Sequence, residues 1–184
     1  VDPAVYDRSR YACHSSALAP HGEKILMHIS NFRRVKRVGD VVRIFARVRE
    51  RMPAQLVLVG DGPDRSLAQE TATELGVADD VLFLGKLDSV AELLARADLL
   101  LLPSEQESCG LAALEAMSCG TPVVGTSGSG IVEVVEHGVT GSLHPVGDVE
   151  AMAGAALELL GDDERWAEVS AAARRRAVKE FSVE

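Results

Sequence analysis

The sequence predicts an α/β fold, a doubly wound parallel sheet of the Rossmann-like type, and three observations support this prediction. Short apolar segments alternate with helical patterns along most of the chain. The apolar segments lack polar alternation, which is typical of parallel strands that helices cover on both faces. Helix-capping residues and glycines fall between the segments. In such folds ligands bind outside the carboxyl ends of the strands, so the loops at that edge are the candidate site.

Six apolar segments are the predicted strands. Each is four to six residues long, as strands usually are, and the last has the weakest pattern. In chain order they are Ile25–Ser30, Leu56–Val59, Val81–Leu84, Leu99–Leu102, Pro122–Gly125 and Gly141–His144.

Helical patterns separate these strands, and local sequence indicates where several helices begin and end. Ser89 and Glu92 have the spacing of a capping box, and Asp148 can cap a helix. Gly76 and Gly120 stand where helices are expected to end. The predicted helices are Val38–Arg51, Arg65–Leu75, Val90–Ala97, Leu111–Ser118, Ile131–His137, Val149–Leu160 and Glu164–Glu180.

The length of 184 residues suits one domain with a substantial core. Residues 25–184 are expected to form this Rossmann-like domain, and residues 1–24 an irregular linker or N-terminal extension. The chain opens at Val1 rather than Met, so we expect it to be part of a longer polypeptide.

Composition argues against two classes of partner. The net charge of −9 disfavours nucleic acid, whose phosphate backbone requires a basic surface. The longest aliphatic run, Leu99–Leu102, is too short to insert into a membrane. Cys13, Cys109 and Cys119 fit neither a disulfide framework nor zinc-ligand spacing, which favours a reducing compartment such as the cytoplasm.

The segment 103–125, PSEQESCGLAALEAMSCGTPVVG, carries the strongest functional signal. Glu107 is expected in a turn and Glu115 about one turn inside the following helix, with their carboxylates about 10–12 Å apart. The free N–H groups of the helix N-terminus lie between them and form an anion site. Because two buried carboxylates without a role are costly, we predict a ligand with a hydroxylated ring at each end and an anionic linker, as in a nucleotide-sugar.

The sequence 30–37, SNFRRVKR, is a basic cluster in an acidic protein, directly after the first strand. Arg33 and Lys36 can neutralise a diphosphate, Arg with a bidentate fork and Lys as a point charge. A solvated basic loop is the better explanation of the cluster alone. Its position on the same sheet edge as the two glutamates favours the phosphate interpretation.

Two Gly-x-Gly turns, at 60–62 and 128–130, are weak evidence for a dinucleotide site. Arg65 and Glu133 occupy the positions of the third glycine, and tight turns explain both motifs. His28 is expected to be a hydrogen-bonded core residue, and Cys109 contributes backbone rather than a nucleophile. No Asp-x-Asp occurs, so the usual carboxylates of a metal-bridged diphosphate are missing and no metal or other cofactor is expected.

Several motifs together resemble the C-terminal, donor-binding half of retaining glycosyltransferases of family 4. They are GDGP at 60–63, FLGKL at 83–87, LLPS at 101–104, the E-x7-E helix, and CGTPVVG at 119–125 with its Gly-rich turn. The resemblance covers nearly the whole chain, and the combination is highly specific. It implies one half of a GT-B type enzyme whose N-terminal acceptor domain is absent.

Within that family, the segments 28–48 and 103–141 look like members that act in bacillithiol biosynthesis. The resemblance therefore implies transfer of N-acetylglucosamine from UDP-N-acetylglucosamine to L-malate, which the missing domain would bind. The isolated domain is expected to be inactive, and a homo-oligomer of the full-length enzyme is left open. A relative with a lipid, polysaccharide or inositol acceptor, an NAD(P)-dependent enzyme and a non-catalytic sugar-nucleotide-binding module remain alternatives.

The resemblance also implies residue roles. Lys36 with Arg33 stabilises the departing diphosphate, Glu107 bonds donor-sugar hydroxyls, and these three are the expected catalytic residues. Glu115 holds the ribose hydroxyls. Many relatives have Gly-Arg at Ser30-Asn31, so whether Arg33 or Asn31 reaches the phosphate stays open. Backbone groups are expected to contact the sugar and phosphate oxygens at Ser108, Cys109, Gly110 and Leu111, and the uracil at Lys86 and Leu87.

Overall fold

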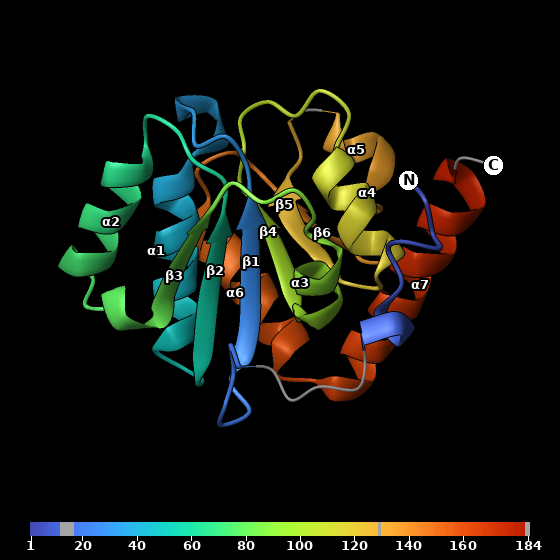
Figure 1. Cartoon of the computed structure of the whole chain (residues 1–184), viewed down its shortest axis with the longest axis horizontal. Helices are drawn as coiled ribbons and strands as arrows, with labels where there is room; N and C mark the ends of the chain where they lie inside the picture. Colours follow the sequence, from blue (N-terminus) through green and yellow to red (C-terminus); the bar gives the residue numbers. More distant parts are fainter. Residues whose placement is uncertain (12–16, 129, 183–184) are drawn as a thin grey trace.

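The computed structural model describes residues 1–11, 17–128 and 130–182. It confirms the predicted fold class: six parallel strands form one sheet in the order β3-β2-β1-β4-β5-β6, with helices on both faces (Figure 1). Cys13, and the middle residue of the second Gly-x-Gly turn, lie outside the described residues. The strands are β1 (Lys24–Ile29), β2 (Ala54–Val59), β3 (Val81–Gly85), β4 (Leu99–Leu102), β5 (Val123–Thr126) and β6 (Gly141–His144).

All seven predicted helices are present. The largest difference is at α5, which was expected to continue to His137 but ends at Val134. Val135 takes an extended conformation and packs into the core, and His137 forms a β-bridge with Gly141 instead. The helices are α1 (Val38–Arg49), α2 (Arg65–Glu74), α3 (Ala91–Arg96), α4 (Leu111–Ser118), α5 (Ile131–Val134), α6 (Val149–Leu160) and α7 (Asp163–Phe181).

The predicted helix ends were correct in three cases and wrong in one. Asp148 caps α6 by accepting a hydrogen bond from the N–H of Ala151 at 3.0 Å. Gly76 and Gly120 follow α2 and α4 with positive φ angles of 70° and 71°. The prediction of a capping box at Ser89 is wrong. Helix α3 begins at Ala91, one residue later than predicted, and its N-cap is Val90, with no side-chain cap.

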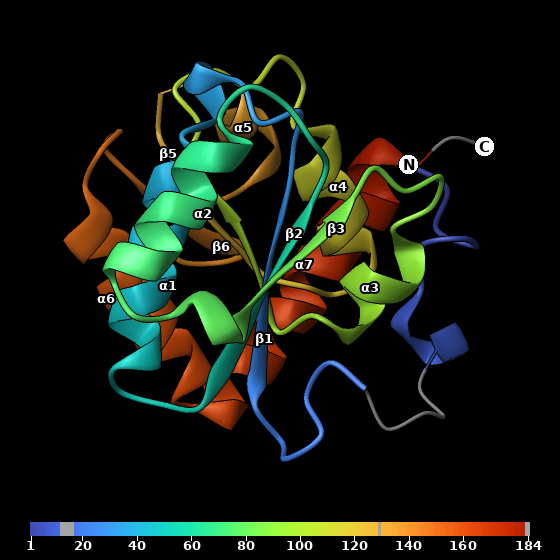
Figure 2. The ribbon, with the colours of Figure 1, turned by 60° about the vertical axis from the view of Figure 1, so that its left-hand side comes forward.

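The four central strands are largely buried on both faces and divide the core into two layers, whereas the edge strands β3 and β6 are only partly buried. Alternate residues of β4 show this division, because Leu99 and Leu101 belong to one layer and Leu100 and Leu102 to the other. Helices α1, α2 and α6 cover the first layer, and α3, α4 and α5 cover the second (Figure 2). Continuous apolar strands are therefore required, as the sequence predicted.

Helix α7 and the N-terminal segment 1–11 lie together at one side of the sheet (Figure 1). We expected residues 1–24 to be an irregular linker, but Arg8–Tyr11 forms a 3₁₀ turn and 1–11 packs on the domain. Arg8 donates hydrogen bonds to the carbonyls of Cys119 and Ala97 and stacks on Trp166. The segment thus belongs to the fold, while the domain division itself stays a prediction.

The loops that follow β1 and β2 touch through their backbones, which only glycine allows. A Cβ on Gly60 would lie 1.7 Å from the carbonyl oxygen of Ser30, and Gly60 has a φ of 121°. A Cβ on Gly62 would lie 1.9 Å from the carbonyl oxygen of Asn31. The first Gly-x-Gly turn is therefore explained by packing against the basic loop.

We expect Gly60→Ala to lower the free energy of unfolding by at least about 2–3 kcal/mol, because the loops must separate and the backbone is strained. Gly154→Ala is the matched control, since a Cβ at this helical position would meet no atom within 4 Å beyond the backbone of its own helix and its chain neighbours. The control should gain up to about 1 kcal/mol from helix propensity. Urea unfolding measures both, and equal stabilities of the two variants would contradict the backbone contact.

His28 is fully buried in β1 and both ring nitrogens are hydrogen-bonded, as predicted for a core histidine. Its Nδ1 lies 2.8 Å from the carbonyl oxygen of Leu101, which can only accept, so Nδ1 carries the proton. Nε2 then accepts from the hydroxyl of Ser30, whose Oγ accepts from the N–H of Phe32. Burial lowers the pKa of His28 to about 4, and the imidazole is neutral at pH 7.

A histidine that stays neutral in the fold and protonates on unfolding makes stability depend on pH. Between the ordinary pKa of 6.5 and about 4, the unfolded state binds more protons, so stability falls as the pH falls. The loss should reach about 3 kcal/mol across this window. Urea unfolding at several pH values gives the free energy of unfolding as a function of pH. Between pH 6.5 and about 4, this free energy should change less with pH in His28→Asn than in wild type or in the exposed control His21→Asn. An unchanged slope in His28→Asn would contradict this role.

Candidate functional site

The structure joins two of the predicted site residues directly. The Nζ of Lys36 lies 2.8 Å from the Oε1 of Glu107, and the two side chains are 19% and 13% exposed. Lys36 comes from the 3₁₀ turn Arg34–Lys36 after β1, and Glu107 from the loop between β4 and α4. Both loops leave the carboxyl ends of adjacent central strands, which is the edge where ligands of this fold class bind.

Further contacts hold these two loops together. The N–H of Glu105 donates to the carbonyl of Val35 at 2.8 Å, and the Glu105 carboxylate accepts from Arg37 at 2.8 Å. Arg37 takes a left-handed conformation with a φ of 51° and also bonds Asp40, in the first turn of α1. The position of Lys36 is therefore fixed by the loop that carries its partner.

Glu107 is supported from two other directions. The hydroxyl of Ser104 donates to its Oε1 at 2.8 Å, and Thr126 donates to the carbonyl of Ser104. The backbone N–H of Gly130 donates to the Glu107 carbonyl at 3.0 Å, and a Cβ on Gly130 would lie 2.8 Å from that oxygen. The second Gly-x-Gly turn thus packs on the Glu107 backbone, although its middle residue is not described.

The N-terminus of α4 is uncapped and lies beside exposed residues. Gly110 is the N-cap, with a φ of 60°, and no side chain caps the helix. Ser108 and Cys109 are exposed, as is Leu111, the first helical residue. The first amides of an α-helix lack intrahelical acceptors and carry the positive end of the dipole, so this terminus suits an anion.

Glu115 lies on the same helix but has a different partner. Its Oε1 accepts a hydrogen bond from the hydroxyl of Tyr6 at 2.8 Å, and the side chain is half-buried. Burial raises the pKa of Glu115, and the hydrogen bond from Tyr6 acts in the opposite direction. The two glutamates are thus held by different parts of the chain, and neither faces bulk water freely.

The other predicted residues lie on exposed loops. Asn31 and Arg33 precede the 3₁₀ turn that carries Lys36, and both are exposed. Lys86 and Leu87 follow β3 and are exposed. Water reaches all four side chains, and their contacts with a ligand stay a prediction.

Sequence reasoning missed three residues that support the site: Tyr6, Ser104 and His28, the last of which was assigned to the core alone. One signal was available for Tyr6, because both tyrosines of the chain fall within residues 1–11 of an otherwise aromatic-poor sequence. Such a concentration indicates a docked segment rather than a linker. No local pattern marks Ser104 as the partner of Glu107.

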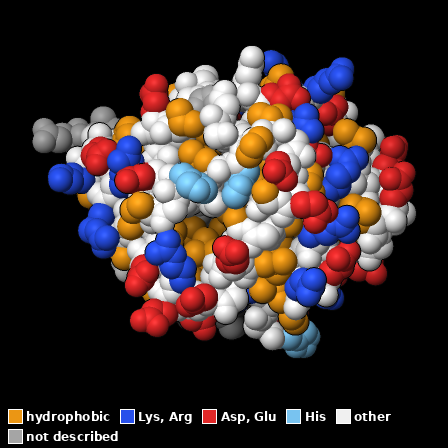
Figure 3. Space-filling view, turned by 180° about the vertical axis from the view of Figure 1, so that it is seen from behind, with side chains coloured by type: hydrophobic (Ala, Val, Ile, Leu, Met, Phe, Trp, Pro, Cys, Tyr) orange, Lys and Arg blue, Asp and Glu red, His pale blue; other side chains and the backbone are white. Residues whose placement is uncertain are grey.

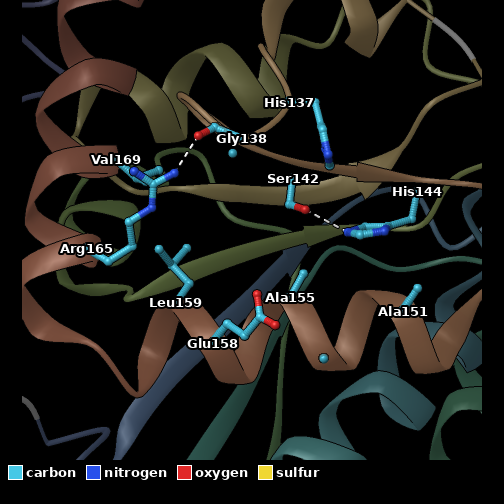
Figure 4. Close-up of a pocket in the computed structure, with 12 residues that line it drawn as sticks. His137, Gly138, Ser142, His144, Ala151, Ala155, Glu158, Leu159, Arg165 and Val169 are labelled. Atoms are coloured by element: carbon cyan, nitrogen blue, oxygen red, sulfur yellow. Dashed lines mark hydrogen bonds between the residues drawn. The ribbon is translucent and has the colours of Figure 1, made fainter.

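A separate pocket of about 540 Å³ lies beyond the edge strand β6, between that strand, α6 and the start of α7 (Figures 3 and 4). Its walls include His137 and His144, whose rings meet edge to face, and the hydroxyl of Ser142, which lies 2.7 Å from His144 Nε2. Glu158 points into it from α6 (Figure 4). None of the predicted donor-binding residues lines this pocket.

The described part of the chain contains neither a metal-binding cluster nor a helix that could span a membrane. In residues 1–11, 17–128 and 130–182, no three His, Cys, Asp or Glu side chains are grouped so as to hold a metal ion. Within the same ranges, no helix has the length and apolar character needed to cross a membrane. The expectation that no metal is needed stays a prediction.

The chain is similar to curated enzymes that are longer than it is. It is 51% identical over 162 residues to N-acetyl-alpha-D-glucosaminyl L-malate synthase of Bacillus anthracis, covering 88% of this chain and 42% of the relative. It is 34% identical over 172 residues to a D-inositol 3-phosphate glycosyltransferase of Thermobispora bispora, covering 87% of this chain and 40% of the relative. The chain spans about two fifths of the length of these relatives.

Solved structures support the fold. Anabaena Alr3699/HepE, crystallised with UDP and glucose, matches with a TM-score of 0.85 and 25% identity over 99% of this chain and 51% of its own. The C-terminal domain of a group 1 family protein, LpcC from Francisella tularensis, matches with a TM-score of 0.84 over the full length of both chains. At 15% identity, the second match shows the fold alone.

A family comparison matches most of the chain. The model that matches is described as Glycosyl transferases group 1, and it covers residues 12–176. That range contains the loop with Lys36, the loop with Glu107 and helix α4. The predicted glycosyltransferase resemblance is thereby confirmed, and the chain belongs to the group 1 glycosyl transferase family.

Proposed function

We propose that this chain binds UDP-N-acetylglucosamine along the carboxyl edge of its sheet, as the donor-binding half of a retaining glycosyltransferase. The observation that carries the proposal is the Lys36–Glu107 ion pair beside the uncapped N-terminus of α4. This arrangement offers a cation and free amides for a diphosphate, with a carboxylate next to them for sugar hydroxyls. The 51% identity to an N-acetylglucosaminyl transferase supports the same donor.

In this proposal Lys36 provides electrostatic stabilisation. The bond from the anomeric carbon to the UDP oxygen breaks, and the acceptor oxygen bonds to the same face of that carbon. Negative charge builds on the departing diphosphate, and the acceptor proton passes to it. A positioned cation in such a site lowers the free energy of the transition state by about a few kcal/mol. Arg33, exposed on the same loop, is the proposed second cation.

Glu107 and Glu115 have separate roles in the proposal. Glu107 has one carboxylate oxygen engaged by Lys36 and Ser104, so its second oxygen is the one proposed for donor-sugar hydroxyls. Glu115 is proposed to accept hydrogen bonds from the ribose. Backbone groups of the loop after β3, at Lys86 and Leu87, are proposed to contact the uracil.

The acceptor is proposed to be L-malate, in a cytoplasmic enzyme that makes a bacillithiol precursor and needs no metal. The support is the relative's activity and the extent of the match. Because the chain spans 42% of that relative, the acceptor pocket is assigned to the remaining part of the longer enzyme. Assay of the longer polypeptide with malate, inositol phosphate and lipid acceptors separates this proposal from its rivals. Product with another acceptor and none with malate would contradict it.

We expect isothermal titration of this chain with UDP to show saturable binding at submillimolar to millimolar concentration. The reason is that the α4 amides and Lys36 together neutralise the diphosphate. Lys36→Ala should weaken binding by roughly tenfold, as expected for the loss of a charge-assisted contact. Absence of heat at millimolar UDP in the wild-type chain would contradict the proposed function.

Comparing the affinities for UDP and for UDP-N-acetylglucosamine should distinguish the roles of the two glutamates. Glu107→Gln should reduce the affinity gained from the sugar more than it changes the affinity for UDP, because its proposed ligand contact is with the hexose and its effect on UDP passes only through Lys36. Glu115→Ala should weaken both ligands by about tenfold, because both contain ribose. Glu74→Gln, an exposed carboxylate at the end of α2, is the matched control. Equal effects of the two site variants on both ligands would show that the division of roles is wrong.

A further inference from the structure

The carboxylate proposed for ribose is held by a side chain from the other end of the sequence. The Tyr6 hydroxyl donates to Glu115 Oε1 at 2.8 Å, across 109 positions of chain. The Tyr6 ring also packs on the core layer that contains α3 and α4. Burial and the neighbouring carboxylate raise the pKa of Tyr6, so the phenol keeps its proton and acts as the donor.

The backbone of Tyr6 is anchored as firmly as its side chain. Its carbonyl accepts hydrogen bonds from the Ser118 hydroxyl, at the last residue of α4, and from Arg174 of α7 at 3.2 Å. Arg174 also pairs with Asp7 at 2.8 Å. Together with the buried contacts of Arg8, these bonds fix residues 6–8 on α4 and α7. Tyr6 is therefore placed by the fold and not by its own hydrogen bond to Glu115.

The hydrogen bond has consequences for Glu115. A carboxylate has two oxygens and can accept several bonds, so a donor on Oε1 leaves Oε2 for ribose hydroxyls. A half-buried glutamate without a donor would lose free energy through desolvation and could adopt other rotamers. The phenol supplies a charge-assisted bond that is compatible with a ligand on the second oxygen.

We propose that Tyr6 is a positioning residue of the donor site, which orients the Glu115 carboxylate for the two ribose hydroxyls. This inference rests on the proposed function, because it takes Glu115 as the ribose acceptor. It adds to that function the segment 1–11, which completes the nucleotide site from the far end of the chain. The oriented Glu115 carboxylate should make the chain bind a ribonucleotide more tightly than a nucleotide that lacks the 2′ and 3′ hydroxyls.

The test is Tyr6→Phe, which removes one oxygen and keeps the ring in place. Binding of UDP and of 2′,3′-dideoxy-UDP to the whole chain is measured by isothermal titration. UDP should bind about fivefold to tenfold more weakly to Tyr6→Phe, as for a lost bond to a charged group, while the dideoxy ligand binds as it does to wild type. The preference for ribose therefore falls. A change confined to folding would weaken both ligands by the same factor and would overturn the proposal.

Two controls sharpen this test. Tyr11→Phe removes the other tyrosine hydroxyl, which makes a long 3.5 Å contact with the carbonyl of Val5, and should leave both affinities unchanged. In a Glu115→Ala background, which has no acceptor left for the phenol, Tyr6→Phe should have no further effect on ribose preference, because Tyr6 acts through the Glu115 carboxylate. Additive effects would overturn the proposal.

The outcomes also separate this proposal from the proposed function. If wild type does not bind UDP, the donor site is wrong and the role of Tyr6 falls with it. If wild type binds UDP and prefers ribose, but Tyr6→Phe keeps that preference, only the role of Tyr6 is wrong. Tighter UDP binding by Tyr6→Phe would mean that the phenol competes with ribose for Glu115, which also contradicts positioning.

Discussion

The 2.8 Å ion pair between Lys36 and Glu107 joins the loop after β1 to the loop after β4. Both side chains are mostly buried, so water screens the pair only in part. The surrounding contacts keep it in place: the Glu105 amide bonds the neighbouring loop, and Gly130 packs on the Glu107 backbone. A lysine already held beside free helix amides needs little rearrangement to meet a diphosphate, and preorganised charge of this kind is the main resource of such sites.

The sheet order explains why these loops meet. β1 and β4 are neighbours, and the chain reverses its winding between them, so the helices that follow them cover opposite faces of the sheet. Folds of this class bind ligands at the carboxyl ends of the strands at such a switch point. The same geometry requires close backbone approach, which Gly60 and Gly62 allow on one side. His28 adds a buried hydrogen-bonded link from β1 to β4 through the Leu101 carbonyl. Packing in the core and placement of the site are therefore parts of one arrangement.

Sequence reasoning predicted the periodic elements well, since apolar pattern and capping chemistry are local. The observed bounds of β4, β6, α4 and α6 agree with the prediction. The predicted α5 was too long, because His137 forms a β-bridge with Gly141 and so cannot continue the helix. For the candidate site, local motifs predicted Lys36 and Glu107, which the structure brings together in an ion pair, and their roles toward a ligand stay a prediction. They could not identify Tyr6, because its contact with Glu115 spans 109 positions and depends on how segment 1–11 docks. Long-range contacts of this kind leave no spacing signal.

The most direct measurement is a crystal structure of this chain with UDP-N-acetylglucosamine bound. The account predicts the diphosphate at the α4 N-terminus within hydrogen-bond distance of Lys36, the hexose on Glu107, and the ribose on Glu115 with the Tyr6 bond retained. Nucleotide bound elsewhere, for example in the pocket beside β6, with the α4 terminus empty, would contradict it.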